Sequence, residues 1–267
     1  MLFRSSNIKL NFIDNKRLAE NLLMDAENID FYLDTCNDDP INKKARRRSN
    51  YVANSISSSD AKYYQSILDK TIPQLPMRLK MDLRDIAIIP LMPSADGGMP
   101  HTRPYSIICF SQLQQINSLS TMIHELWHIH QRKYANTWTT VFEQLGWKVW
   151  GGELPTFLEK HRRINPDTMD EPLWIYQDIW VPVPIFQDIS FPSVTNVDIW
   201  FYHVKEGHHV KQIPSTIINF FPGLPKSAYE HPREITAYLL SDHNAQYESP
   251  AFKILLSSMG HLAISSS

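Results

Sequence analysis

The chain has 267 residues, of which 43% are hydrophobic and 20% are charged, and its formal net charge is −2. This composition is typical of one sizeable globular domain, or of a catalytic domain with a small extension, and the charge gives no general attraction to nucleic acids or membranes. The two cysteines, Cys36 and Cys109, argue against a disulfide scaffold and a cysteine-based zinc finger. Apolar runs stay short of the roughly 18 residues of a membrane span. The first ten residues lack the apolar core of a signal peptide, so we expect an intracellular, non-membrane protein.

Helical patterns dominate residues 1–80, which we expect to form an N-terminal helical extension. Apolar spacing predicts helices over 16–32 and 61–72. Between them lies the only dense run of positive charge, Lys43–Arg48. This run could direct nuclear import or contact nucleic acid, although a solvated loop is the simpler interpretation.

Residues 81–267 are expected to form an α+β catalytic domain. Two short apolar strands, 85–92 and 105–110, are joined by a turn rich in Gly, Ser and Pro, with His101, Thr102 and Arg103 at the mouth of this predicted hairpin. Either strand could be the sheet edge that receives an extended substrate.

A helix predicted over 117–133 follows the second strand directly. Further along the chain, strand-like runs over 173–186 and 196–212 predict a β-ribbon or small sheet inserted at about 151–215. Two helical patterns, 228–244 and 251–262, complete the order of elements.

The helix predicted over 117–133 contains His-Glu-Leu-Trp-His at residues 124–128, the pattern H-E-x-x-H. Four residues of α-helix turn through about 400°, so His124 and His128 project from one face, one turn apart. Two neutral imidazoles placed in this way can bind one Zn²⁺, and Glu125 lies close enough to take a proton from a zinc-bound water. The alternative is a buried helix whose histidines bond to the backbone. The spacing favours a hydrolytic zinc centre.

A hydrolytic zinc site normally has three protein ligands and one open position, so a third ligand is needed. Its best source is the segment 227–240, in which Pro232 suits the first turn of a helix and would place Glu234 near the helix start. Glu230 and His231 are alternative ligands. Glu234 could instead only favour the helix N-terminus electrostatically, a contribution of about 0.3–1 kcal/mol.

Together these two segments resemble the gluzincin class of zinc metallopeptidases. The sequence Glu-His-Pro-Arg-Glu-Ile-Thr-Ala at 230–237 is similar to the Asn-Pro-x-Glu-x-x-Ala helix of minimal gluzincins and to the ligand helix of the lethal-factor type. The resemblance implies a zincin-like core of active helix, small sheet and ligand helix. It also implies that His124, His128 and Glu234 are Zn²⁺ ligands and that Glu125 is the general base and acid.

The match to gluzincins is incomplete. Gln131 fits a recurrent H-E-x-x-H-x-x-Q variant, but His231 stands where the family usually has Asn and Tyr238 where it often has an acidic residue. The segment between the two motifs is also longer than a compact gluzincin needs, which is why we expect an insertion. The metzincin class is excluded because Gln131 and Tyr134 occupy the positions of its required Gly and third His.

Stabilising the developing oxyanion requires a hydrogen-bond donor, commonly Tyr or His. The candidates are Tyr229, His231, Tyr238 and His243, and we prefer Tyr229 because it precedes the ligand by more than one helical turn. A structural role for Tyr229 is the alternative. The pair His208-His209 could form a second metal site, although an exposed hairpin tip is the simpler interpretation.

The sequence therefore predicts a zinc-dependent hydrolase, most specifically a metallopeptidase acting on a peptide or protein substrate. One alternative is a non-catalytic zinc-binding structural or interaction protein with a zincin fold. A second alternative is a nucleic-acid or nuclear factor that uses Lys43–Arg48, which the overall charge disfavours.

Overall fold

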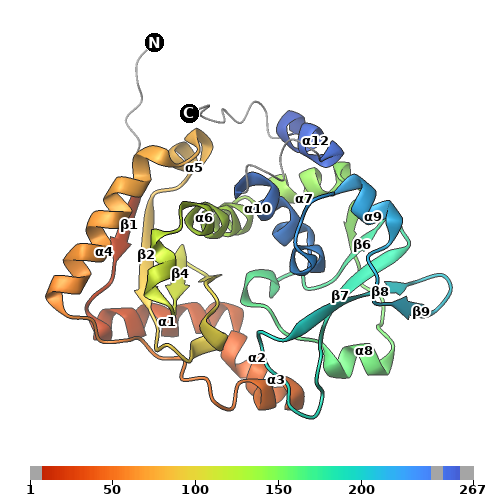
Figure 1. Ribbon diagram of the computed structural model, residues 1–267, viewed down its shortest axis with the longest axis horizontal. Helices are drawn as coiled ribbons and strands as arrows, with labels where there is room; N and C mark the ends of the chain where they lie inside the picture. Colours follow the sequence, from red (N-terminus) through yellow and green to blue (C-terminus); the bar gives the residue numbers. More distant parts are fainter. Residues whose placement is uncertain (1–7, 242–248, 259–267) are drawn as a thin grey trace. The chain divides into compact units, whose positions relative to one another are not determined.

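The computed structural model describes residues 8–241 and 249–258, and this part of the chain divides into two compact units (Figure 1). The first unit comprises residues 8–30 and 49–133, and the second comprises residues 31–48, 134–241 and 249–258. Both units combine α-helices with one small β-sheet, so the expected α+β class is confirmed.

The first unit is built on a four-stranded sheet in the order β1-β2-β4-β3. Its strands are β1 (Lys9–Phe12), β2 (Asp85–Pro90), β3 (His101–Arg103) and β4 (Ile107–Phe110). The first, second and fourth strands are parallel, whereas β3 is antiparallel to β4 at one edge. Both β2 and β4 are almost continuously apolar, as expected of parallel strands that are buried on both faces.

Helices of the first unit pack against this sheet. They are α1 (Lys16–Asp30), α4 (Ser58–Thr71), α5 (Met77–Asp82) and α6 (Leu119–Lys133), with 3₁₀ turns at Ile72–Gln74, Ala95–Gly98 and Leu113–Asn117. Ala19, Leu23 and Ala26 of α1 form a core cluster with Ile107 and Cys109 of β4. Figure 1 shows α6 on the other side of the sheet, where it contacts β3 and β4. Packing on the sheet therefore positions the helix that carries the H-E-x-x-H pattern.

The second unit is built on a five-stranded antiparallel sheet in the order β5-β6-β7-β8-β9. Its strands are β5 (Trp147–Val149), β6 (Trp174–Tyr176), β7 (Trp180–Phe186), β8 (Val197–His203) and β9 (His208–Val210). Leu158 packs against Val181, Val183 and Ile185 of β7. This sheet includes the strand-like runs predicted over 173–186 and 196–212, and it begins before the expected insertion.

The helices of the second unit are short. They are α2 (Tyr32–Asp38), α3 (Pro40–Ala45), α7 (Ala135–Gln144), α8 (Thr156–His161), α9 (Ser215–Phe220), α10 (Pro232–Ser241) and α12 (Pro250–Ser258), with 3₁₀ turns at Pro166–Thr168 and Lys226–Glu230. The predicted helix over 228–244 is thus a 3₁₀ turn followed by α10, and Pro232 begins α10 as expected.

Residues 1–80 are not the separate helical extension that we expected. The strand β1 pairs with β2 in register from Lys9 opposite Asp85 to Phe12 opposite Ile88, so the start of the chain is part of the first sheet. Residues 31–48 belong to the second unit instead. The helix predicted over 16–32 ends at Asp30 because Phe31 adopts a left-handed conformation with φ 50°.

The expected hairpin between the two apolar strands is also wrong. The strands β2 and β4 are parallel neighbours, and the residues that we placed at the mouth of a hairpin form the edge strand β3. A parallel pair needs a long connection rather than a tight turn, and this connection includes β3 itself.

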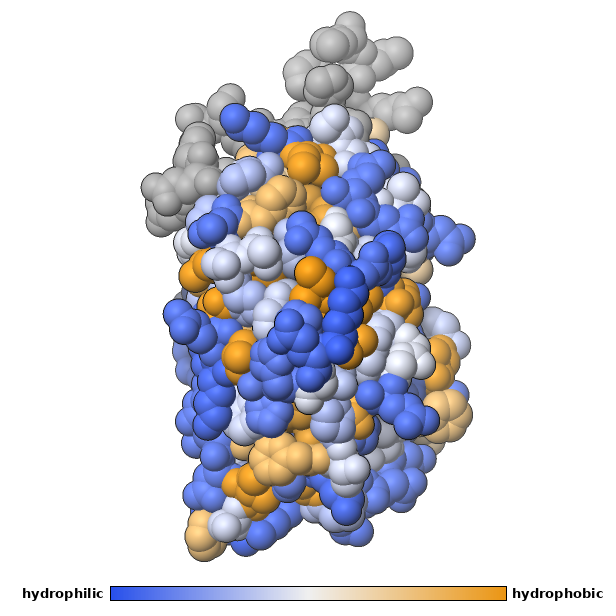
Figure 2. Space-filling model, turned by 90° about the vertical axis from the view of Figure 1, so that its right-hand side faces the viewer, coloured by the Kyte–Doolittle hydropathy of each residue, from blue (hydrophilic) through white to orange (hydrophobic). Residues whose placement is uncertain are grey.

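None of the described helices is both long and apolar enough to span a membrane. Figure 2 shows one face of the molecule, on which apolar side chains lie in several separate places among polar ones. Isolated exposed apolar side chains are normal in folded domains, so we assign no docking surface to this face.

Candidate metal centre

The helix α6 places His124 and His128 on one face, one turn apart. Their Nε2 atoms lie 3.0 Å from each other, and the two rings meet edge to face with centroids 4.6 Å apart. The helix starts after Ser118, whose hydroxyl accepts a hydrogen bond from the backbone N–H of Thr121 at 3.2 Å. The pair of imidazole nitrogens predicted from the spacing is therefore present in the first unit.

Gln131 determines which nitrogen of His128 carries the proton. The Oε1 atom of Gln131 lies 2.9 Å from Nδ1 of His128, and the Gln131 side chain is completely buried. Because an amide oxygen only accepts hydrogen bonds, Nδ1 of His128 donates, and the neutral ring keeps a lone pair on Nε2. That lone pair faces His124, where it can accept a proton or bind a cation.

The separation of the two Nε2 atoms is compatible with a shared metal ion. Two Zn–N bonds of about 2.0–2.1 Å at a tetrahedral angle place their nitrogens about 3.3 Å apart. A direct hydrogen bond between the imidazoles is the metal-free alternative, with His124 as the donor. Both arrangements need the tautomer of His128 that Gln131 imposes.

Glu125 is the middle residue of the pattern and lies about 100° around the helix from His124. Its side chain is 4% exposed, so a carboxylate stands beside the histidine pair in a largely dehydrated environment. Proton transfer is the chemistry that a carboxylate in this position can perform.

Glu234 lies in the first turn of α10 and is 9% exposed. Its Oε1 atom accepts a hydrogen bond of 3.2 Å from Nδ2 of Asn165. The ligands predicted from the sequence, called the three-residue group below, are His124 and His128 of the first unit and Glu234 of the second. Two imidazoles and one carboxylate are a donor set that catalytic Zn²⁺ uses, so the residues fit this ion.

The alternative ligands, Glu230 and His231, are engaged elsewhere. The carboxylate of Glu230 accepts hydrogen bonds from Nη2 of Arg163 and Nδ2 of Asn165, each at 2.5 Å. Burial raises the pKa of Glu230, while Arg163 opposes the rise. The structure therefore gives Glu230 a position in a hydrogen-bond network rather than in the three-residue group.

His231 uses both ring nitrogens. Nδ1 accepts the backbone N–H of Arg233 at 3.1 Å, and Nε2 lies 2.9 Å from the carbonyl oxygen of Glu171, to which it must donate. Burial lowers the pKa of His231 to about 3, so the ring is neutral at ordinary pH. Both ring nitrogens are therefore occupied by hydrogen bonds within the second unit, and these contacts do not support His231 as a metal ligand or an oxyanion donor.

Tyr229 has a structural contact. Its side chain is 1% exposed, and its hydroxyl donates to the carbonyl oxygen of Phe221 at 2.5 Å. A hydroxyl that gives its proton to a backbone carbonyl has none left for an oxyanion, so we assign Tyr229 the structural role. Tyr238 is half-buried on α10, and His243 lies outside the described residues.

The polar residues predicted at the mouth of a hairpin do not line a cleft. His101, Thr102 and Arg103 are at most 3% exposed. The guanidinium of Arg103 forms an ion pair with Asp30 at 2.7 Å, and Nε2 of His101 lies 2.6 Å from the hydroxyl of Tyr51. These groups bind one another inside the first unit.

The remaining candidates have simpler explanations. In the charge run Lys43–Arg48, Arg46 donates to the hydroxyl of Tyr32 and to the carbonyl oxygen of Ile164. These bonds connect two segments of the second unit that are distant in the sequence. His208 and His209 lie on β9 outside the three-residue group, and the ring of His209 stacks on Trp200 with centroids 4.9 Å apart.

Sequence reasoning missed Asn165, which donates to Glu234 from 69 positions away. The one local signal is Asn165-Pro-Asp, because asparagine before proline is typical of a residue that caps a short helix.

The resemblance to gluzincins is confined to residues 124–131 and 230–237. Compared with known proteins, the chain matches no family model, no curated protein and no solved structure.

Proposed function

We propose that this protein is a zinc-dependent hydrolase, and within that class a metallopeptidase with a zincin-like core. The observation that carries the proposal is the histidine pair of α6, whose Nε2 atoms lie 3.0 Å apart. The lone pair of His128 is directed to this position by the contact of Nδ1 with Gln131. Glu234 supplies the third donor of the group.

In this proposal Nε2 of His124, Nε2 of His128 and a carboxylate oxygen of Glu234 hold the ion. Two neutral donors and one anion leave a bound divalent cation with a net positive charge. When bound there, Zn²⁺ would polarise a substrate carbonyl and lower the pKa of a water molecule.

Glu125 is the residue that moves the proton. A carboxylate next to the histidine pair can accept a proton from the attacking water and later donate it to the leaving amine. The burial of Glu125 at 4% exposure supports this role, because electrostatic interactions are stronger where water is scarce.

The same burial favours one second candidate, a zinc-binding structural or interaction protein without catalysis. With Glu125 at 4% and His128 at 2% exposure, the proposed base and one of the proposed ligands offer little surface to a substrate. The two candidates agree on the metal and differ only in whether a peptide bond is cleaved.

A cleavage assay separates them. Zinc-loaded wild type and Glu125→Gln are incubated with a peptide library, with Glu143→Gln on the exposed face of α7 as the matched control. We expect wild type and the control to cleave, and Glu125→Gln to keep its zinc while losing about 10²–10⁴-fold in rate. Zinc-loaded wild type that is as inert as Glu125→Gln would establish the non-catalytic candidate instead.

A further inference from the structure

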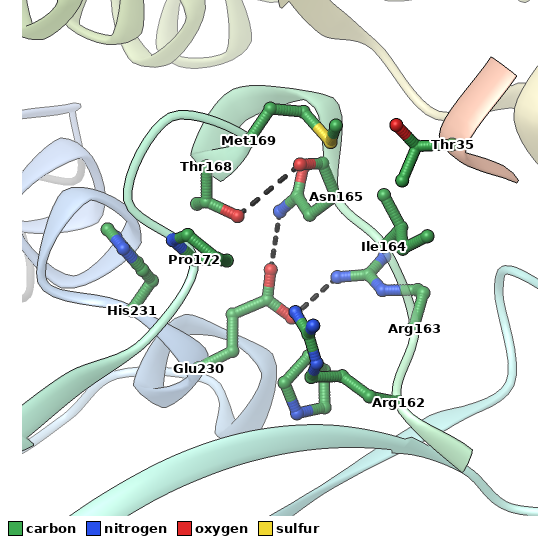
Figure 3. A pocket seen from close by; sticks show the side chains of 11 residues that line it. Thr35, Arg162, Arg163, Ile164, Asn165, Thr168, Met169, Pro172, Glu230 and His231 are labelled. Atoms are coloured by element: carbon green, nitrogen blue, oxygen red, sulfur yellow. Dashed lines mark hydrogen bonds and ion pairs between the residues drawn. The ribbon is translucent and has the colours of Figure 1, made fainter. Parts of the chain in front are cut away.

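Asn165 hydrogen-bonds two carboxylates of the second unit with a single nitrogen. Its Nδ2 atom donates to Oε1 of Glu230 at 2.5 Å and to Oε1 of Glu234 at 3.2 Å. An amide nitrogen carries two hydrogens, so each carboxylate receives one. Figure 3 shows Asn165 directed at Glu230, beside a pocket of about 130 Å³ that both residues line.

The orientation of the Asn165 amide is fixed by the backbone. Its Oδ1 atom accepts the N–H of Asp167 at 3.0 Å and thereby caps the 3₁₀ turn Pro166–Thr168. With the oxygen committed to a donor, the nitrogen must face the carboxylates. The hydroxyl of Thr168 also donates to the carbonyl oxygen of Asn165 at 3.3 Å. The amide is therefore held in one orientation before any metal binds.

Arg163 supplies the positive charge that two neighbouring carboxylates require. Its Nη2 atom binds Oε2 of Glu230 at 2.5 Å, and the two side chains are only 12% and 5% exposed. Its backbone N–H donates to the carbonyl oxygen of Pro184 in β7 at 2.7 Å. The backbone of Arg163 is thus attached to the sheet of the second unit, and its guanidinium binds the carboxylate oxygen of Glu230 that Asn165 does not contact (Figure 3).

The loop that contains Arg163 and Asn165 extends to Glu171, and it also contacts the start of α10 through Asp170 and Glu171. Arg233 forms two hydrogen bonds of 2.6 Å with the carboxylate of Asp170, and His231 donates to the carbonyl oxygen of Glu171. The loop is consequently bound to three residues just before Glu234, namely Glu230, His231 and Arg233.

We propose that Asn165 is a positioning residue for Glu234, supported by Glu230 and Arg163. This inference rests on the proposed function, in which Glu234 is a zinc ligand. Asn165 restrains the Glu234 carboxylate by one hydrogen bond, while Arg163 and Glu230 keep the Asn165 amide in place. The network determines the orientation in which Glu234 is presented and so contributes to zinc affinity without contacting the metal.

The test is zinc affinity, measured on the full chain by competition with a chromophoric chelator. We expect Asn165→Ala to bind Zn²⁺ about 10–100-fold more weakly than wild type, the usual effect of removing a group that orients a ligand. Arg163→Gln, which leaves the Asn165 cap intact, should weaken binding in the same direction.

The neighbouring Arg162→Gln is the matched control. Arg162 lines the same pocket, but its Nη2 atom pairs with the exposed Glu159 at 3.1 Å, so its removal should leave zinc affinity unchanged. The visible absorption spectrum of the Co²⁺-loaded proteins is the second readout. It reports the arrangement of ligands, and we expect it to change in Asn165→Ala and Arg163→Gln only.

The outcomes separate this inference from the proposed function. A wild type that binds no zinc refutes the function and the inference together. A wild type that binds zinc, with folded Asn165→Ala and Arg163→Gln matching it in affinity and Co²⁺ spectrum, overturns the positioning role alone. Loss of stability in the metal-free variants without a change in either readout identifies a merely structural network and also overturns it.

Discussion

Nδ1 of His128 lies 2.9 Å from Oε1 of Gln131, one helical turn further along α6. This contact determines the tautomer of the second histidine in the H-E-x-x-H pattern and leaves its Nε2 lone pair directed at His124. A metal-binding histidine usually donates its other N–H to an acceptor in this way. The position of Gln131 in the sequence therefore has a physical meaning beyond its match to a motif variant.

The first prediction concerns this contact. Replacing Gln131 with Leu removes the acceptor and frees His128 to adopt the other tautomer or rotate, so zinc affinity should fall by about 10–100-fold. Chelator competition measures it, and Gln74→Leu, at an exposed position of the same unit, should leave affinity unchanged. Equal zinc affinities for wild type and Gln131→Leu would show that the hydrogen bond between His128 and Gln131 does not orient His128 for metal binding.

The second prediction concerns stability and pH. Because the pKa of His231 is lowered by burial from 6.5 to about 3, the unfolded chain binds one more proton than the folded chain between these values. Stability should therefore decrease as pH falls below about 6.5, by up to about 1.4 kcal/mol per pH unit from this residue. The free energy of unfolding of the metal-free protein, measured by denaturant titration across this range, checks the slope.

The control for the pH prediction is a second histidine. His231→Gln should flatten the slope below pH 6.5, whereas His209→Gln, on the exposed strand β9, should leave it as in wild type. Identical slopes for wild type and His231→Gln would mean that His231 is not held neutral in the folded protein.

The third prediction concerns the anchoring of α10. Arg233 is 3% exposed at its side chain, and its two hydrogen bonds to Asp170 hold it in that buried position. Asp170→Ala should cost about 1.5–3 kcal/mol, the usual contribution of hydrogen bonds to a charged group. Thermal and denaturant unfolding measure the loss.

Asp178→Ala provides the comparison, because Asp178 pairs with Lys148 where both side chains are 61% exposed. An exposed pair of this kind contributes about 0–1 kcal/mol. If both variants lose the same stability, the Arg233 pair does not anchor the helix.

Local patterns in the sequence predicted the parts of the site that depend on helix geometry. The helix Leu119–Lys133 and the one-turn separation of its two histidines follow from the 3.6-residue period and from the absence of Gly and Pro. Pro232 correctly predicted where α10 begins.

Features that depend on distant parts of the chain could not be predicted. Residues 9–12 are too few to show a strand period, and their pairing with β2 depends on residues more than 70 positions away. The contact of the Asn165 amide with Glu234 could not be predicted because nothing in the neighbouring sequence indicates it. The parallel order of β2 and β4 was missed because apolar strands of this length fit either a hairpin or a parallel pair.

The most direct test of the central claim is the zinc content of the purified chain after dialysis against Zn²⁺. The claim predicts about one zinc per wild-type chain, bound by the three-ligand set of a catalytic site. It predicts that His128→Ala and Glu234→Ala lose this zinc and that the exposed-site variant His209→Ala retains it. A wild type without stoichiometric zinc, or a Glu234→Ala variant with wild-type content and affinity, would contradict it.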